Sequence, residues 1–297
     1  MSFFFEVLIG GLLSGVMYSL VALGFVLIYK ASGVFNFAQG AMVFYAALTY
    51  VGLLETGLAW WMAIPATLVV MVILGLLTER FVLRPLVNQP QISLLMATIG
   101  LTFFIEGAAQ LMWGANVRAL ELGVQDEPIA WLMDTANINI SRFDLMAAFV
   151  AAVLVTVLAL FFSRTRIGRA LRAVADDHQA ALAVGIPLQQ IWAIVWGVAG
   201  ALALVAGLLW GARNGVQFAL TFVALKALPV LILGGFDSIP GAIVGGLIIG
   251  ATEKLAEVYL GPLVGGGIEG WFPYVLALLF LLVRPEGLFG EKIIRRI

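Results

Sequence analysis

Apolar runs long enough to cross a lipid bilayer recur along nearly the whole chain, and this pattern constrains the fold most. A membrane-spanning helix needs roughly 20 mostly apolar residues. The chain is 63% apolar and 11% charged, whereas a soluble domain carries about 25% charged residues. We therefore expect an all-α polytopic membrane protein with about nine spans, eight to ten being compatible with the pattern. The expected spans are 6–29, 37–54, 62–83, 92–113, 143–162, 188–211, 217–236, 239–259 and 271–284.

Two of these runs, 37–54 and 217–236, are short or interrupted, which leaves a re-entrant arrangement open for them. The first run has no basic stretch before it, so we expect a retained first span and not a cleaved signal peptide. The net charge of −1 disfavours a nucleic-acid partner. The lack of cysteine excludes disulfides and Cys-ligated metal sites.

Lysine and arginine gather in alternate connections between the spans, which assigns those connections to the cytoplasm. With nine spans this arrangement also places the C-terminus there. The opposite connections are poor in basic residues, with Arg213 as an exception. The residues assigned to the cytoplasmic side are Lys30, Arg80, Arg84, Arg164, Arg166, Arg169, Arg172, Arg284, Lys292, Arg295 and Arg296.

The connection 114–142 mixes acidic and basic residues and is too polar for a further span. We expect an extracytoplasmic loop with a short surface helix around Glu127–Met133. Such a loop is either simply solvated or a docking ledge for an extracytoplasmic partner.

The polar segment 163–187 separates two strongly apolar runs and contains four arginines among many alanines. Its composition predicts a helix from Arg166 to Val184, interrupted at Asp176 and Asp177, with Gly185 beginning the stop. Such a segment is either an anchor that fixes topology or a small-faced helix pair that seats in a groove of a partner protein.

Polar residues inside the apolar runs need a structural or functional reason, because burying a polar side chain in lipid costs free energy. Asn36 and Gln39 lie in GVFNFAQGA, where we expect broken backbone, and they form either a brace or part of a solute pathway. Lys226 needs a partner or water, and Glu106 and Glu253 are the candidate partners.

Glycines cluster in the first span and across the last third of the chain. We interpret these clusters as close helix packing, with room for a pathway as the alternative. The clustered residues are Gly10, Gly11, Gly15, Gly24, Gly234, Gly235, Gly241, Gly245, Gly246 and Gly250.

No catalytic constellation is visible in the sequence. The one histidine, His178, stands beside Asp176 and Asp177, where a solvated side chain is expected, and no second histidine completes a metal pair. No G-x-x-x-x-G-K-[ST] phosphate loop occurs either. Uphill transport by this chain would therefore need an ion gradient or another subunit.

Four passages together resemble one family, the permease subunits of bacterial ABC importers for branched-chain and other hydrophobic amino acids. TRIGRALRAVADDHQAALAVGI is similar to the cytoplasmic coupling loop of that family, and GVFNFAQGA to its second-span motif. TERFVLRPLVNQPQISLLMATIGLTFFIE and KALPVLILGGFDSIPGAIVGGLIIG resemble its third-to-fourth and seventh-to-eighth span passages. The match covers nearly the whole chain in the right order.

This resemblance implies a single transmembrane permease domain over 1–297, in the inner membrane of a bacterium. It also implies a second permease subunit, identical or related, two cytoplasmic ATP-binding subunits and an extracytoplasmic solute-binding protein. The chain itself would be no enzyme and would bind no cofactor, ATP being used by the partner subunits. The residues in or beside the ATPase groove would be Arg169, Arg172, Asp176, Asp177, Ala180, Ala181 and Gly185. The residues we assign to the translocation pathway are Asn36, Gln39, Glu106 and Lys226.

The chain departs from the family at one motif. Where the family commonly has a histidine and a glutamate, this chain has Gln39 and Ala41. The solute could accordingly be urea, a short amide or a small carboxylate instead of an amino acid. One other class of function is a stand-alone secondary transporter or channel, in which Glu106 and Glu253 would serve ion coupling. A third class is an intramembrane enzyme, for which the sequence lacks catalytic residues.

Overall fold

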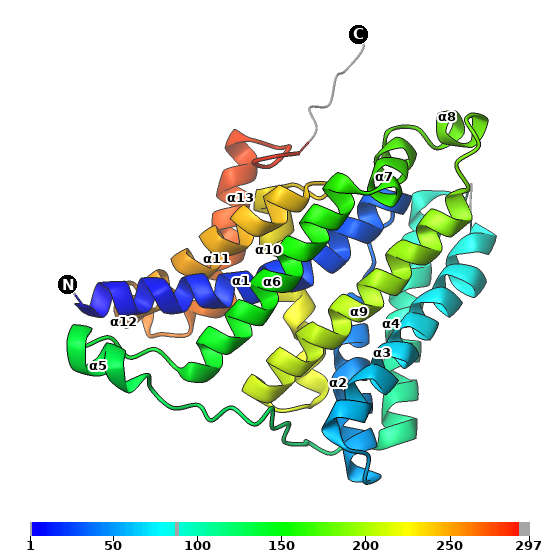
Figure 1. Ribbon diagram of the computed structural model, residues 1–297. Coiled ribbons are helices and arrows are strands. Elements are labelled where there is room, and N and C mark those ends of the chain that lie inside the picture. Colours follow the sequence, from blue (N-terminus) through cyan, green and yellow to red (C-terminus); the bar gives the residue numbers. More distant parts are fainter. Residues whose placement is uncertain (1, 87–88, 291–297) are drawn as a thin grey trace. The chain divides into compact units, whose positions relative to one another are not determined.

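The computed structural model describes residues 2–86 and 89–290, and within these ranges the chain forms helices joined by mostly short connections, with a long one over 114–129 (Figure 1). No extended strand occurs in these ranges, which contain two isolated β-bridges. The expected all-α polytopic class is confirmed. Lys292, Arg295 and Arg296, which contributed to the expected orientation of the C-terminus, lie outside the described residues.

Six helical segments in the described ranges are long and apolar enough to cross a membrane. They are α1 (Ser2–Ser32), α3 with its continuation (Trp60–Leu86), α4 (Gln91–Trp113), α6 (Arg142–Arg164), α9 (Leu188–Asn214) and α11 (Ile239–Tyr259).

The remaining three expected spans are helical but shorter. They are α2 (Gln39–Glu55), α10 (Val223–Gly234) after the 3-10 turn η3 (Phe218–Phe222), and α13 (Phe272–Val283). The run 37–54 is short, as expected, because its helix α2 is continuous but begins only at Gln39, and the run 217–236 is interrupted, because a 3-10 turn precedes α10. Whether all nine segments cross the membrane stays a prediction.

The chain divides into two compact units, one made of residues 1–22, 123–157 and 225–297 and the other of 23–122 and 158–224. The expectation of a single permease domain stays a prediction. We call the first the split unit and the second the loop unit, because the second contains 163–187.

In the loop unit, α9 packs against α2 and α3, and α2 packs against α4 (Figure 1). Glycines allow this close approach. A Cβ added at Gly207 of α9 would stand 2.6 Å from the carbonyl oxygen of Val43 in α2. Gly75 of α3 and Gly200 of α9 meet backbone of the opposite helix in the same way. Small residues promote association in lipid because no hydrophobic drive acts between helices there.

In the split unit, glycines of α1 face glycines of α11. A Cβ at Gly11 would lie 2.6 Å from the carbonyl oxygen of Gly250, and one at Gly15 would lie 2.5 Å from that of Gly246. Gly234 and Gly241 meet in the same manner between α10 and α11. At these positions the packing interpretation of the glycine clusters is confirmed.

The third apolar run ends in a turn that the sequence did not predict. α3 (Trp60–Leu77) is followed by the π-helical η1 (Thr78–Leu83) and the 3-10 η2 (Arg84–Leu86). Arg84 donates from Nε and Nη2 to the two carboxylate oxygens of Glu79, at 3.1 and 2.9 Å. This bidentate pair satisfies a carboxylate that is 1% exposed and fixes the turn.

The short helix expected around Glu127–Met133 is present but starts later, as α5 (Ala130–Ala136). Pro128 forms an isolated bridge with Ser141 instead, which keeps the chain extended up to Ile129. The chain closes the helix at Asn137, whose φ of 51° is left-handed. The small helices α12 (Gly261–Val264) and η4 (Ile268–Gly270) connect α11 to α13.

Candidate functional site

The segment 163–187 folds as two short helices, α7 (Arg166–Asp176) and α8 (His178–Ala183), as the sequence predicted. Thr165 caps α7 by accepting the amide of Gly168 at 3.2 Å. Asp177 separates the helices and caps α8, since its Oδ1 accepts the amides of Gln179 and Ala180 at 2.8 and 3.1 Å. A side-chain oxygen at this place satisfies amides that have no partner inside the helix. The predicted interruption therefore has a definite cause in Asp177.

The exit from α8 also follows the prediction. Gly185 has a φ of +83°, a left-handed conformation that glycine adopts without strain. Its amide and that of Ile186 bond back to the carbonyls of Leu182 and Ala181, at 3.0 and 2.9 Å. Pro187 then precedes α9 as its N-cap residue.

Arg172 holds α7 against the end of α6. Its guanidinium donates to the carbonyl oxygens of Phe162 and Ser163, at 2.9 and 3.4 Å. These carbonyls belong to the last turn of α6, where helical partners are missing and a positive charge is favoured. Gly168 lies so close to the Phe162 carbonyl that any Cβ there would clash with it. In this structure the guanidinium of Arg172 bonds within the loop unit, and its place in or beside an ATPase groove stays a prediction.

The other predicted coupling residues differ in exposure. Arg169, Asp176, Asp177, Ala180 and Gly185 are exposed. Ala181 is only 2% exposed and packs inside the loop. Their contact with an ATPase subunit stays a prediction.

Sequence reasoning missed two apolar residues of the loop. Leu182 is 55% exposed and Val184 is 75% exposed, in a segment that also presents charged side chains. The signal was the pair of large apolar residues among the alanines of QAALAVGI. Exposed apolar residues grouped beside charged ones are typical of protein contact surfaces.

A pocket of about 380 Å³ adjoins Leu182 in the loop unit. Its lining residues are Arg84, Leu182, Pro187, Leu188, Gln189, Gln190 and Trp192. The Trp192 indole donates to the carbonyl of Ala31, at 2.8 Å, and so ties the start of α9 to the end of α1. Lys30, Arg84 and the loop arginines thus share one end of the loop unit, as the alternation of basic connections predicted.

Asn36 lies in the broken backbone between α1 and α2, Gln39 is the first residue of α2, and both are fully buried. The Asn36 amide donates to Gln39 Oε1 at 3.3 Å, and Asn36 Oδ1 accepts the amide of Ala38 at 3.1 Å. Thr98 of α4 donates its hydroxyl to the carbonyl of Phe35 at 3.2 Å. Broken backbone was expected here and is confirmed. The contacts are those of a brace, and a pathway role for either amide stays a prediction.

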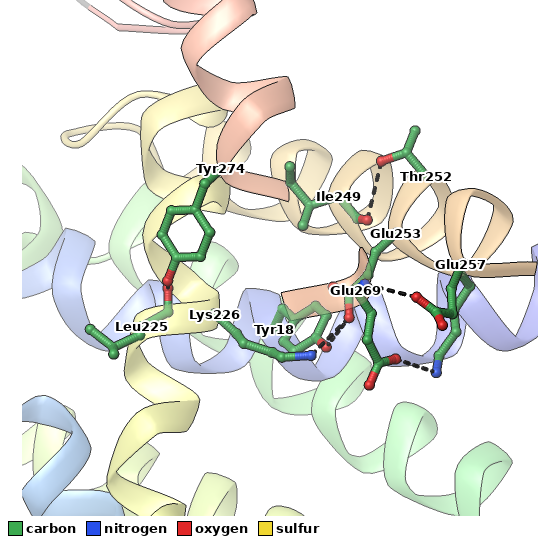
Figure 2. Close-up of polar contacts among 10 residues, drawn as sticks. Tyr18, Leu225, Lys226, Ile249, Thr252, Glu253, Glu257, Glu269 and Tyr274 are labelled. Atoms are coloured by element: carbon green, nitrogen blue, oxygen red, sulfur yellow. Dashed lines mark hydrogen bonds and ion pairs between the residues drawn. The ribbon is translucent and has the colours of Figure 1, made fainter. Parts of the chain in front are cut away.

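Lys226 of α10 pairs with Glu253 of α11 in the split unit (Figure 2). Of the two candidate partners, Glu253 is thus the one it uses. The ammonium stands 2.9 Å from Glu253 Oε1, and the hydroxyl of Tyr18 in α1 donates to the same oxygen at 3.1 Å. The Tyr274 hydroxyl donates to the carbonyl of Leu225 at 2.8 Å. This carbonyl loses its helical donor to Pro229, so Tyr274 replaces the missing bond.

Glu106 of α4 is 8% exposed and has no ion pair with a lysine or arginine of residues 2–86 and 89–290. Its assignment to a pathway stays a prediction.

Comparison with known proteins places these features in a family. Residues 7–284 match the family model described as the permease component of the branched-chain amino acid transport system. The chain belongs to this family.

Three relatives show how far the similarity extends over this permease. It is 28% identical to the high-affinity branched-chain amino acid transport system permease protein LivH of Escherichia coli, over 99% of this chain and 98% of that one. It is 30% identical to the corresponding protein BraD of Pseudomonas aeruginosa, with the same coverage. It is 30% identical to the probable branched-chain amino acid transport permease protein LivH of Methanocaldococcus jannaschii, over 96% and 92%.

The loop 163–187 and the Lys226–Glu253 pair both lie within the residues that match the family model. With its apolar helices, this permease is a multi-pass protein of the inner membrane.

Proposed function

We propose that this permease is a membrane subunit of an ATP-driven importer and that it conducts branched-chain amino acids. The named solute of its relatives supports this substrate class, and the similarity covers almost the full length of each chain. ATP hydrolysis is assigned to separate partner subunits.

The observation that carries the coupling role is the shape and surface of 163–187. The two capped helices and the turn after them present exposed side chains, which are apolar at Leu182 and Val184 and charged at Arg169 and Asp176. Apolar side chains supply contact area in a partner's groove, and charges around them set orientation. In our proposal, α7 and α8 seat in a groove of a cytoplasmic ATP-binding subunit.

The complex would contain a second permease, two ATP-binding subunits and an extracytoplasmic solute-binding protein. The basic end of the loop unit would face the cytoplasm, and the C-terminus would lie on the same side. The loop 114–142 would then face the solute-binding protein. The ATPase cycle would move the permeases between inward-facing and outward-facing states.

The test is reconstitution. The permease is purified in mild detergent with the subunits that accompany it, placed in proteoliposomes and supplied with the solute-binding protein. We expect uptake of radiolabelled L-leucine that requires ATP on the loop side of the membrane. A permease that purifies alone and transports L-leucine without ATP would contradict the proposal and would favour a stand-alone transporter.

The coupling step has its own control. Gly185→Val forces a β-branched side chain into a left-handed conformation, which should abolish ATP-dependent uptake while the protein still inserts and folds. Gly57 has the same kind of backbone, with φ of +91°, and its position is open in the connection after α2. Gly57→Val carries a similar backbone strain away from 163–187 and should retain uptake.

A further inference from the structure

The Lys226–Glu253 pair is the buried polar feature of the split unit that packing does not explain. Glu253 is 1% exposed and sits in the apolar helix α11. Burying a carboxylate is costly unless its oxygens find partners. Two donors, the ammonium of Lys226 and the hydroxyl of Tyr18, bond to the same oxygen, Oε1. The other oxygen, Oε2, is buried and has no hydrogen-bond partner.

The chain contains a second pair that shows what a structural ion pair looks like. Glu79 and Arg84 have nearly the same side-chain exposures, 2% and 35%, as Glu253 and Lys226, 2% and 33%. In that pair both carboxylate oxygens are bonded by the one guanidinium. The two pairs differ in Oε2 of Glu253, a buried acceptor that costs free energy as long as no donor bonds to it.

Lys226 offers the complementary group. An ammonium has three N–H donors, and the bond to Glu253 Oε1 uses one of them. Its side chain is one-third exposed and that of Glu253 is 2% exposed, so the pair is approached from the Lys226 end, with Glu253 deeper in the helix packing. The Tyr18 ring lies next to the ammonium (Figure 2), with its centroid 5.9 Å from Nζ, and its π face favours the positive charge.

We propose that this pair is a binding site for the two charged groups of an α-amino acid in transit. The solute's ammonium donates to Glu253 Oε2, and the solute's carboxylate accepts from the N–H groups that Lys226 has left. The four charges alternate in sign and sum to zero, so the zwitterion enters without leaving an uncompensated charge in the low-dielectric interior. The inference rests on the proposed function and adds to it a place in the permease where the amino-acid backbone is recognised.

The experiment compares three ligands that differ only in charge. L-leucine carries both groups, L-leucinamide lacks the carboxylate, and 4-methylpentanoate lacks the ammonium. The intact transporter complex is placed in nanodiscs without the solute-binding protein, and each ligand competes with radiolabelled L-leucine. Each lost hydrogen bond to a charged group should weaken binding about ten-fold or more, so the wild type should prefer L-leucine to both analogues.

Two isosteric variants assign the charges. Lys226→Met should bind L-leucine and L-leucinamide equally well and still prefer L-leucine to 4-methylpentanoate. Glu253→Gln should bind L-leucine and 4-methylpentanoate equally well and still prefer L-leucine to L-leucinamide. A purely structural pair predicts that each variant weakens all three ligands by the same factor, and this result would overturn the site.

Two further variants guard against loss of folding. The double variant Lys226→Met/Glu253→Gln leaves no unpaired buried charge, so it should assemble with its partner subunits yet bind L-leucine about 100-fold more weakly. Wild-type binding by this double variant would refute the proposal. The control is Lys254→Met on the same helix, which removes a half-exposed pair with Glu269 at 3.3 Å and should bind all three ligands like the wild type.

The proposed function and the binding site give different outcomes when each is wrong. A wild-type complex that hydrolyses ATP but neither binds nor imports L-leucine would overturn the proposed function together with the site. Normal uptake by the wild type, with the variants keeping all ligand preferences, would overturn the site alone.

Discussion

Truncating Leu182 and Val184 together should weaken docking of the ATP-binding subunit by a predictable amount. Leu→Ala removes three carbon groups and Val→Ala removes two, each contributing about 0.8 kcal/mol when buried. Only the area still exposed in the free permease, 55% and 75% respectively, is available for burial by a partner. The expected losses are therefore about 1.3 kcal/mol at Leu182 and about 1.2 kcal/mol at Val184. Their total, about 2.5 kcal/mol, corresponds to roughly 70-fold weaker binding.

The assay is a titration of purified ATP-binding subunit onto the permease in nanodiscs, by fluorescence anisotropy. The double variant should keep the wild-type unfolding temperature, because both side chains are exposed and support little of the fold. Leu160 of α6 is exposed to a similar degree, 51%, but lies on a membrane-spanning helix, so Leu160→Ala is the matched control and should bind normally. Wild-type affinity in the Leu182→Ala/Val184→Ala variant would refute the docking surface.

Three further predictions concern the fold around the site. Asp177→Ala removes the cap of α8 and should destabilise that helix by about 1 kcal/mol. The measurement is hydrogen exchange of the amides in 178–183, which should become faster. Unchanged exchange would show that the cap is dispensable. Gly11→Ala places a Cβ 2.6 Å from the Gly250 carbonyl oxygen and should lower the free energy of unfolding by about 1–3 kcal/mol. The control is Gly10→Ala, because a Cβ there meets nothing within 4 Å. Equal losses of stability in the two variants would contradict close packing of α1 against α11. Gln39→Leu removes the oxygen that accepts from the Asn36 amide, which then keeps only Met42 Sδ at 3.7 Å as an acceptor, and this should cost about 1–3 kcal/mol in unfolding experiments. We also expect a changed uptake rate with unchanged solute affinity of the binding protein, and an unchanged rate would make Gln39 a brace only.

Much of the fold follows from local sequence signals. Each expected span is helical because runs of apolar residues leave no other way to satisfy backbone groups in lipid. The interruption at Asp177 and the turn at Gly185 were predictable because capping and left-handed backbone depend on the residue itself. The glycine contacts between α1 and α11 could be foreseen as packing, although the pairing of Gly11 with Gly250 could not.

The features that were missed depend on contacts between distant or differently oriented residues. The π-helical turn at Thr78–Leu83 has no composition signal, and only the bidentate bond of Arg84 to Glu79 explains it. Sequence left Lys226 with two candidate partners, because 27 and 120 residues of chain separation carry no information on distance in space. Tyr18 gives no signal in the sequence, because a tyrosine in an apolar run looks like any other core residue.

The bond from Arg172 to the last carbonyls of α6 has a mechanical consequence. It joins α7 to the end of α6, while the short link through Gly185 and Pro187 joins α8 to the start of α9. A force applied to α7 and α8 is therefore transmitted both to the end of α6 and to the start of α9, because both connections are short. Without the Arg172 bond, α7 would stay joined to α6 through the single residue Thr165, so the angle between these two helices would be less firmly held and less of the same push would reach α6.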